Sequence, residues 1–222
     1  MSIRLGAKTA LHLASEGRFS TLLRKIGHRL HEGWYQEDVS YGLRRDLQAP
    51  FTAPAAKAPI YVRQIRPEDI ETLCDGWRDD PELAWRRELL EKDLRTCYVA
   101  VDERTGAPCY MQWLMSSDQN WQIQTIGAFP KLKPDEALLE NAYTPASHRG
   151  LGIMPAAMAL IAAKAADFGA RYVITFVHRD NVPSLKGCEK AGFSTYCIPR
   201  RSDAFFGVIR RLRFEATLAE AI

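Results

Sequence analysis

Apolar residues recur along this chain either in short runs or at steps of three and four positions. A short alternating or continuous apolar run between turn residues predicts a strand, because successive strand side chains point to opposite faces. The chain has such runs at 60–65, 97–102, 108–114, 121–126, 137–144, 171–177, 193–198 and 205–214. A basic polar loop is expected over 199–203, between the last two strands.

Apolar residues three and four positions apart share one face of a helix. This pattern predicts helices over 67–77, 81–95, 152–168 and 181–191. Gly169 and Gly192 follow the last two helices, where glycine commonly ends a helix. The strand at 137–144, the helix at 152–168 and the strand at 171–177 form a βαβ unit. The chain is therefore predicted to be an α/β protein.

The residues before position 60 have a different pattern. Residues 1–32 predict a basic helix with one apolar face, which either packs on the rest of the chain or meets a membrane surface or a partner. Residues 33–47 contain too many large apolar side chains for a linker and predict a strand or an ordered loop. The Pro/Ala-rich segment 49–59 predicts a connector. We therefore expect an N-terminal extension, 1–55, and a domain, 56–222.

Net charge, cysteine use and hydropathy narrow the class of protein further. A net charge of +3 over 222 residues does not favour nucleic acid as the main partner. Five cysteines without a C-x-x-C pair indicate reduced thiols, as in a cytoplasmic protein. No run approaches the roughly 18 apolar residues of a membrane span, and charged residues interrupt any signal-peptide core. We expect a cytoplasmic protein without a membrane segment or a bound metal.

The most informative stretch runs from Tyr143 to Ala156 and connects a strand to a helix. A helix start leaves about four backbone N–H groups without partners and carries partial positive charge. Gly150 and Gly152 let a ligand approach the backbone, and Arg149 adds a cation. The stretch thus predicts an anion site, with an ordinary turn before a helix as the alternative. It lacks the Gly-Lys-Ser/Thr of a P-loop and the third glycine of a Rossmann fingerprint.

This loop resembles that of the GNAT superfamily of acyl-CoA-dependent N-acyltransferases, whose pattern is Arg/Gln-x-x-Gly-x-Gly/Ala. Arg149 and Gly152 match the pattern, whereas Met154 departs from it. A second segment, Asn181-x-x-Ser184 followed by Lys-Ala-Gly-Phe, resembles the family's Asn-x-x-Ala/Ser and Lys-x-Gly-Phe at the spacing the family uses. The chain is similar to this superfamily in element order over about 60–215.

The resemblance implies a mixed, mostly antiparallel central sheet with flanking helices, in which the strands 137–144 and 171–177 are parallel and splay apart. It also implies an acyl-CoA, usually acetyl-CoA, as co-substrate. The pyrophosphate would rest on loop N–H groups, and the pantetheine arm would enter the gap between the two strands. The residues expected to bind it are Ala142, Tyr143, Thr144, Arg149, Gly150, Leu151, Gly152, Ile153, Met154, Asn181 and Ser184.

The reaction implied by the resemblance is direct attack of an amine on the thioester carbon. It needs a base for the ammonium, and backbone donors near Tyr143 to stabilise the oxyanion. Glu140 shares a predicted strand face with Leu138 and Ala142, so burial would raise its pKa. A structural carboxylate paired with an arginine is the alternative for this residue. The candidate bases are Glu140, Glu136 and His178.

The acid that protonates the leaving thiolate is less clearly indicated. The family usually has a tyrosine one turn after the Asn/Ser pair, and this chain has Cys188 there. A thiol can donate a proton, although a buried structural thiol is the alternative. Tyr196 or water can take the role instead, or the thiolate can leave without an acid.

Three functions remain open from the sequence. The first is an N-acetyltransferase that acts on a small-molecule primary amine. The second is a protein-directed acyltransferase that uses the N-terminal extension for docking. The third is a non-catalytic acyl-CoA-binding domain. A homodimer formed through the late strands is possible in each case.

Overall fold

The computed structural model describes residues 35–74, 86, 89–90, 96–127, 129–205 and 208–216. The contacts within the chain define two units. Of the described residues, the larger unit contains those within Ser40–Ile198 and Ala216, and the smaller one contains Tyr35–Val39 and those within Pro199–Glu215. The helix predicted over 1–32 and most of the helix predicted over 81–95 lie outside the described residues.

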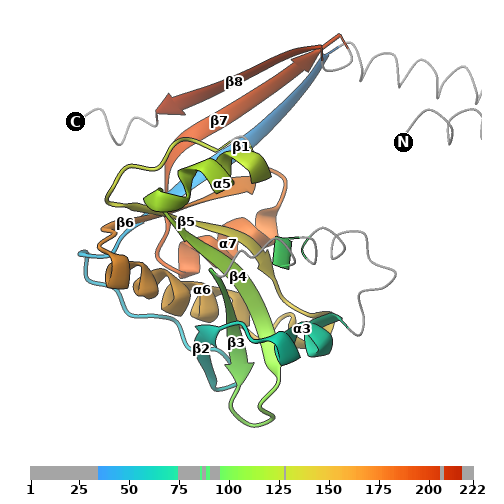
Figure 1. Cartoon of the computed structure of the whole chain (residues 1–222), viewed down its shortest axis with the longest axis vertical. Helices are drawn as coiled ribbons and strands as arrows, with labels where there is room; N and C mark the ends of the chain where they lie inside the picture. The colour runs from blue at the N-terminus through green and yellow to red at the C-terminus, as the bar shows by residue number, and fades with distance from the viewer. Residues whose placement is uncertain are drawn as a thin grey trace, which may run out of the picture. The chain divides into compact units, whose positions relative to one another are not determined.

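The described strands form one mixed sheet in the order β2-β3-β4-β5-β6-β1-β7-β8 (Figure 1). β5 and β6 are parallel, whereas β2–β3, β3–β4, β4–β5 and β6–β1 are antiparallel. This arrangement confirms the expected fold class. The strands are β1 Tyr35–Asp46, β2 Ile60–Gln64, β3 Cys97–Asp102, β4 Pro108–Ser116, β5 Glu136–Tyr143, β6 Tyr172–His178, β7 Ser194–Ala204 and β8 Ile209–Ala216.

Helices of the larger unit begin and end at residues that the sequence marks as helix caps. Asn181 accepts a hydrogen bond from the Ser184 backbone at 3.3 Å and so caps α7. A short 3₁₀ segment extends α6, and the chain then leaves the helix at Gly169, whose φ is 83°. The α-helices are α3 Pro67–Cys74, α5 Asn120–Ile126, α6 Ile153–Ala163 and α7 Val182–Lys190, and the 3₁₀ helices are η1 Ser117–Gln119, η2 Ala146–His148 and η3 Lys164–Phe168.

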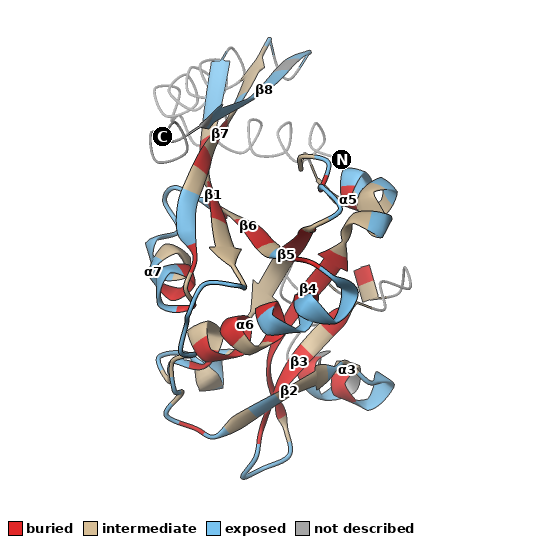
Figure 2. Ribbon diagram, turned by 90° about the vertical axis from the view of Figure 1, so that its left-hand side faces the viewer, coloured by how far each residue is buried: buried red, intermediate tan, exposed pale blue. Residues whose placement is uncertain are grey.

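In the larger unit, the helices cover both faces of the sheet. One buried cluster joins α6 and α7 to strand residues such as Ala137, Leu139 and Val173. The other joins α3 and α5 to residues of the opposite strand face, such as Leu138 and Ile174. β4 is buried along nearly its whole length, which Figure 2 shows as an almost continuous red strand. Burial on both faces explains why β6 is a continuous apolar run rather than an alternating one.

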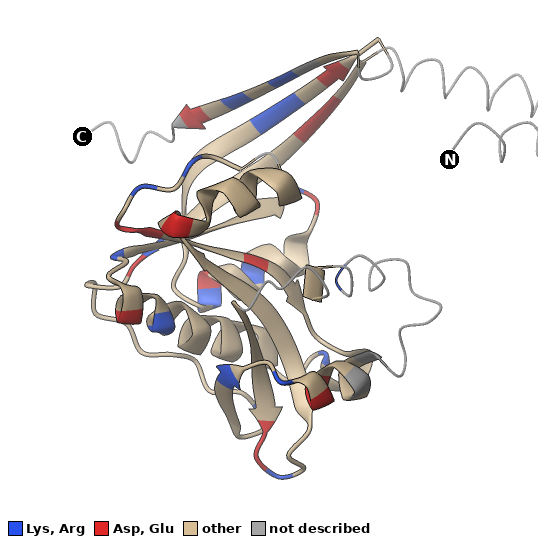
Figure 3. Ribbon diagram, viewed as in Figure 1, with Lys and Arg blue, Asp and Glu red and all other residues tan. Residues whose placement is uncertain are grey.

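In the smaller unit, the ends of β1 and β7 and most of β8 are held partly by charge pairs. Arg200 contacts Glu37 at 3.7 Å and Glu215 at 3.0 Å, which links the three strands. Arg201 pairs with Asp203 at 2.7 Å along β7. Figure 3 shows the basic and acidic positions as blue and red bands on these three strands.

Two sequence-based predictions of secondary structure were wrong. Residues 121–126, predicted as a strand, form α5, which buries Ile123. Its first residue, Asn120, exchanges two hydrogen bonds with the backbone of Leu132, so a distant loop selects the helix. The loop predicted over 199–203 is part of β7, because Arg200 finds acidic partners on the neighbouring strands.

The segment 33–47, predicted as a strand or an ordered loop, forms β1 from Tyr35 onwards. Within the larger unit, Ser40–Asp46 pair with the whole of β6 in antiparallel register. These residues fall inside the predicted extension 1–55. They pair with the edge of β6 that faces away from β5.

An ion pair between β2 and α3 provides a test of the fold. Asp69 is 3% exposed and accepts hydrogen bonds from both terminal nitrogens of Arg63 and, at 2.7 Å, from the backbone of Arg66. Burial raises the pKa of Asp69, but these bonds outweigh burial and hold it below the usual 3.8. The pair therefore stabilises the fold above about pH 4, and this stability is lost as pH falls further.

We expect Arg63→Met to lower the free energy of unfolding by about 3 kcal/mol at pH 7, because a buried carboxylate loses its partner. Urea denaturation measures the change. Arg66→Met is the matched control, since the Arg66–Glu68 pair is exposed and 3.9 Å apart. The control should change stability by less than about 1 kcal/mol. Equal effects of the two substitutions would show that the buried Arg63–Asp69 pair does not stabilise the fold more than the exposed Arg66–Glu68 pair.

Candidate active site

The parallel strands β5 and β6 pair over only part of their length. Glu136, Ala137 and Leu138 lie in register with Tyr172, Val173 and Ile174, and the pairing ends there. Beyond this point β5 stays paired with β4, while β6 stays paired with β1. Each strand thus keeps one neighbour and leaves the other, as expected from the sequence. Backbone groups along the separated edges need other partners.

A β-bulge accompanies this separation. Glu140 lies opposite Trp113 and Tyr143 lies opposite Met111, so β5 has one residue more than β4 in this interval. Asn141 has a φ of 60°, in the left-handed region that asparagine tolerates better than most residues. The extra residue shifts the side-chain alternation, and Ala142 packs with the cluster under α6. The expectation that Glu140 and Ala142 share a strand face was therefore wrong.

A cavity of about 900 Å³ opens beside the loop that joins β5 to α6. Gly150 and Gly152 both have positive φ, 77° and 71°, which lets the loop turn sharply into the helix. Arg149 donates to the Thr144 carbonyl at 3.0 Å and closes the loop. The Lys57 backbone donates to Leu151 at 2.9 Å, so the predicted connector forms part of the wall.

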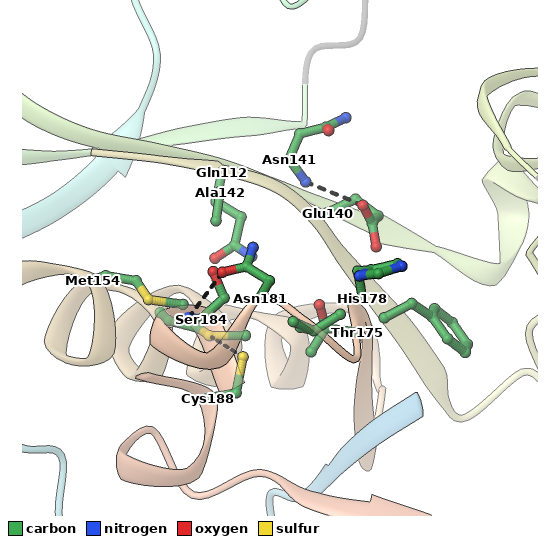
Figure 4. Close-up of a pocket in the computed structure, with 13 residues that line it drawn as sticks. Gln112, Glu140, Asn141, Ala142, Met154, Thr175, His178, Asn181, Ser184 and Cys188 are labelled. Atoms are coloured by element: carbon green, nitrogen blue, oxygen red, sulfur yellow. Dashed lines mark hydrogen bonds between the residues drawn. The ribbon is translucent and has the colours of Figure 1, made fainter. Parts of the chain in front are cut away.

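The cavity brings together every residue that the sequence associated with acyl-CoA binding. They are Ala142, Tyr143, Thr144, Arg149, Gly150, Leu151, Gly152, Ile153, Met154, Asn181 and Ser184. A second cavity, of about 170 Å³, lies where β5 and β6 separate (Figure 4). Ala142, Met154, Asn181 and Ser184 line both cavities, so the two share a wall.

Three of the candidate catalytic residues, Glu140, His178 and Cys188, line the smaller cavity. Figure 4 shows the Glu140 carboxylate and the His178 ring directed at the same part of it. Tyr196 lines neither cavity and packs instead with the cluster on the other face of the sheet, where the Arg44 guanidinium lies over its ring. Burial raises the pKa of Tyr196 far above its usual value.

The Glu140 carboxylate is only partly satisfied by the protein. Oε2 accepts a hydrogen bond from the Asn141 backbone at 3.3 Å. Oε1 is buried and accepts no hydrogen bond from the described residues. Burial raises the pKa of Glu140 to about 7, against the opposing influence of the Asn141 and Phe176 backbone N–H groups and of Arg86. A carboxyl group with this pKa can exchange protons near neutral pH.

His178 and Cys188 have different environments. Nδ1 of His178 accepts a hydrogen bond from the Asp180 backbone at 3.1 Å, which places the proton of the neutral ring on Nε2. Cys188 is 1% exposed, and its thiol points at the sulfur of Met158, 3.8 Å away. Burial raises the pKa of Cys188 to about 12, so the thiol stays protonated at neutral pH.

Sequence reasoning missed several residues that line the cavities. Gln112 is 1% exposed, lines the smaller cavity and accepts a hydrogen bond from the Tyr110 hydroxyl at 2.7 Å. A glutamine inside an otherwise apolar strand was the signal that could have identified it. Arg86 donates to the Ala142 carbonyl at 3.5 Å and lies over the Tyr143 ring, which no local pattern indicates. Other missed residues are Lys57, Lys186, Lys190, Met158 and Thr175.

Comparison with known proteins agrees with this geometry. Residues 60–194 match the family model described as an acetyltransferase (GNAT) domain. The match covers more than half of the chain, and the chain belongs to the GNAT acetyltransferase family. Among proteins of curated function, none is similar enough to count as a match.

Solved structures show the same fold at low sequence identity. An acetyltransferase of the GNAT family from Colwellia psychrerythraea is 15% identical, with a TM-score of 0.51 over 82% of this chain and 57% of its own. A glucosamine N-acetyltransferase region of a fungal GH3 β-N-acetylglucosaminidase is 18% identical, with a TM-score of 0.54 over 80% of this chain and 22% of its own. This chain thus spans little more than half of the Colwellia protein.

A functionally unknown protein from Staphylococcus epidermidis is 11% identical, with a TM-score of 0.51 over 89% of this chain and 68% of its own. Within the described residues, no helix is long and apolar enough to cross a membrane. The same residues contain no group of three or more His, Cys, Asp or Glu side chains that could hold a metal ion.

Met154, which departs from the family pattern, is accommodated by a glycine on the neighbouring helix. The Met154 side chain lies directly over Gly187, where a Cβ would overlap its sulfur. Gly187 is buried in the middle of α7, a position where glycine normally costs about 1 kcal/mol relative to alanine. A Cβ added at position 187 would therefore force the end of the Met154 side chain to move.

We expect Gly187→Ala to lower the free energy of unfolding by about 1 kcal/mol, because the overlap outweighs the gain in helix propensity. In the Met154→Ala background the same substitution should be neutral or stabilising. Chemical denaturation of both single variants and the double variant measures the coupling, expected at about 1–2 kcal/mol. Additive effects would show that the two side chains do not meet.

Proposed function

We propose that this chain is an N-acetyltransferase that transfers the acetyl group of acetyl-CoA to a primary amine of a small molecule. The observation that carries the proposal is the gap between β5 and β6, where the two cavities share a wall. One cavity has the cationic loop suited to a diphosphate, and the other has an ionisable carboxyl group. A thioester located between them would be within reach of an amine beside Glu140.

The residues present fit the co-substrate at three places. The backbone N–H groups of 150–154 would hold the pyrophosphate at the start of α6, with Arg149 beside it. The separated edge of β5 at Ala142–Thr144 would pair with the amides of the pantetheine arm. Asn181 uses its side-chain oxygen to cap α7, which leaves its NH₂ group for the arm. Bound acetyl-CoA supplies the activated acyl group.

Glu140 is the base in this proposal. An ammonium group has to lose a proton before it can attack, and a carboxylate with a pKa of about 7 accepts that proton at neutral pH. His178 is the second candidate, since it lines the same cavity. Backbone N–H groups near Tyr143 would stabilise the oxyanion. The leaving thiolate would take its proton from water or leave without an acid, because a Cys188 thiol with a pKa of about 12 is a weaker acid than an ordinary thiol and points at Met158. Tyr196 lines neither cavity.

The proposal also includes the cellular location of the protein and the part of the chain that carries out catalysis. A cytoplasmic protein is supported by four buried cysteines of the described residues that form no disulfide. We assign catalysis to residues 56–222, with β1 of the extension completing the sheet beside β6. A homodimer stays a prediction.

Binding of the co-substrate is the first test. We expect isothermal titration calorimetry with coenzyme A to give saturable binding, and release of free thiol from acetyl-CoA to depend on an added amine. The amine panel should contain amino sugars including glucosamine, amino acids, polyamines and a lysine-containing peptide. Binding without turnover of any amine would favour a non-catalytic domain. Turnover of the peptide alone would favour a protein-directed enzyme.

The second test concerns Glu140. We expect kcat/KM to rise with pH up to about 7 and then level off, because the base works in its deprotonated form. Glu140→Gln should lower kcat by about 10²–10⁴-fold and remove this rise, while coenzyme A still binds. Glu189→Gln is the matched control, since Glu189 is exposed and lines neither cavity. An unchanged pH profile in Glu140→Gln would transfer the role to His178.

A further inference from the structure

Gln112 is a buried amide in the middle of β4, a strand whose other buried residues are apolar or aromatic. The residue is 1% exposed and lines the smaller cavity. Its side-chain oxygen accepts the hydrogen bond of the Tyr110 hydroxyl, whereas its NH₂ group donates none to another described residue. A buried donor without a partner costs free energy. A donor left open towards a cavity therefore indicates a ligand that accepts a hydrogen bond.

Tyr110 fixes the orientation of this amide. The tyrosine is fully buried, and its hydroxyl lies 2.7 Å from the Gln112 oxygen. Burial raises the pKa of Tyr110 well above its usual value, so the hydroxyl keeps its proton and remains a donor. With the oxygen held at one end, the NH₂ group is preorganised at the other.

The Gln112 side chain lies on the face of the sheet that α6 and α7 cover. Tyr110 and Leu114, two residues before and after it, belong to the cluster under these helices, and alternate strand residues share a face. Glu140 lies opposite Trp113, whose side chain belongs to the cluster on the other face. The amide and the carboxylate thus approach the smaller cavity from opposite faces of the sheet, and Figure 4 shows both side chains there.

This position selects the part of the co-substrate that can reach Gln112. The residue lines the smaller cavity and not the larger one. The pantetheine arm would pair with the edge of β5 beside the larger cavity, so only the end of the arm, which carries the thioester, would enter the smaller one. The acceptor atom at that end is the thioester oxygen, which becomes a stronger acceptor when it gains negative charge.

We infer that Gln112 is a further catalytic residue, whose NH₂ group donates a hydrogen bond to the thioester oxygen. The inference rests on the proposed function, because it concerns the same reaction. As the amine nitrogen bonds to the thioester carbon, an electron pair of the C=O bond moves onto the oxygen, where Gln112 stabilises the charge. When this pair returns, the C–S bond breaks and coenzyme A leaves as the thiolate. The nitrogen loses its extra proton to water, and the thiolate gains one from water.

The experiment removes the NH₂ group without leaving the Tyr110 hydroxyl unpaired. Tyr110→Phe/Gln112→Met replaces both hydrogen-bonding groups by apolar ones of similar shape, whereas Tyr110→Phe alone keeps the amide. We expect the double variant to lower kcat about 10²–10³-fold with every amine that the protein acetylates. Tyr110→Phe should lower it at most about tenfold, since it removes only the anchor of the amide. Affinity for coenzyme A, which has no thioester, should be the same in both variants by calorimetry.

Gln64→Met is the control for the exchange of glutamine for methionine on a strand. Gln64 is exposed and lines neither cavity, so this variant should keep the kcat of the unaltered protein.

A spectroscopic measurement separates a direct contact from a structural effect. A hydrogen bond to a carbonyl oxygen weakens the C=O bond and lowers its stretching frequency. Difference infrared spectra of bound, carbonyl-labelled acetyl-CoA are recorded without an amine. We expect a lower thioester frequency in Tyr110→Phe than in Tyr110→Phe/Gln112→Met.

The outcomes separate this inference from the proposed function. Equal frequencies, or an equal kcat in the two variants, overturn the role of Gln112 alone. A loss confined to one amine would assign Gln112 to the acceptor, and a loss of coenzyme A affinity would assign it to the arm, so either result also overturns it. If the protein acetylates no amine, the proposed function fails and this inference fails with it. An unchanged unfolding temperature shows that the variants are folded, and Tyr110→Phe/Gln112→Leu replaces the double variant if it is not.

Discussion

The separation of β5 and β6 is the constraint on which the candidate site depends. Two parallel strands that stay paired would satisfy each other's backbone groups and leave no gap. Here the register ends at Leu138, because β4 holds one strand and β1 holds the other. The bulge at Asn141 turns the end of β5 and redirects its side chains. Both cavities lie at this divergence.

Burial changes the pKa values of the ionisable side chains at the gap between β5 and β6. Glu140 lies on the bulged strand opposite Trp113, a fully buried residue, and its Oε1 has lost contact with water. An exposed carboxyl group would be ionised well below neutral pH, and a poor base there. The same burial keeps the Cys188 thiol protonated. One apolar environment thus raises the pKa of both groups, bringing that of the carboxyl group close to neutral pH and moving that of the thiol further from it.

The spacing of α6 and α7 fixes the width of the larger cavity. Arg45 of β1 donates to the carbonyls of Ala159 and Ala191, at 3.2 and 3.3 Å, and so ties α6 to the end of α7. At the other end the Met154 side chain fits over Gly187. These contacts therefore hold the two helices at a fixed separation beside the larger cavity.

Local sequence determined the elements and the anion loop. Hydrophobic periodicity, caps such as Asn181 and Gly169, and the glycines at 150 and 152 act over a few residues, so they can be interpreted without neighbours. Tertiary structure decided the secondary structure of segments whose side chains bind residues distant in the sequence. Residues 120–126 form a helix because the Asn120 side chain binds the backbone of Leu132. Residues 199–203 belong to a strand because Arg200 meets Glu37 and Glu215.

The same distinction holds for the site. The loop residues follow one another in the sequence, and the residues of the Asn181 motif lie within four positions of one another. Both segments line the larger cavity. The bulge at Asn141 arises between two strands, and the approach of Arg86 to Ala142 arises between a helix and a strand. Sequence therefore identified the loop and the Asn181 motif that line the larger cavity. Only the packing of the sheet decided which of them share a cavity, because strand register and burial are properties of several segments at once.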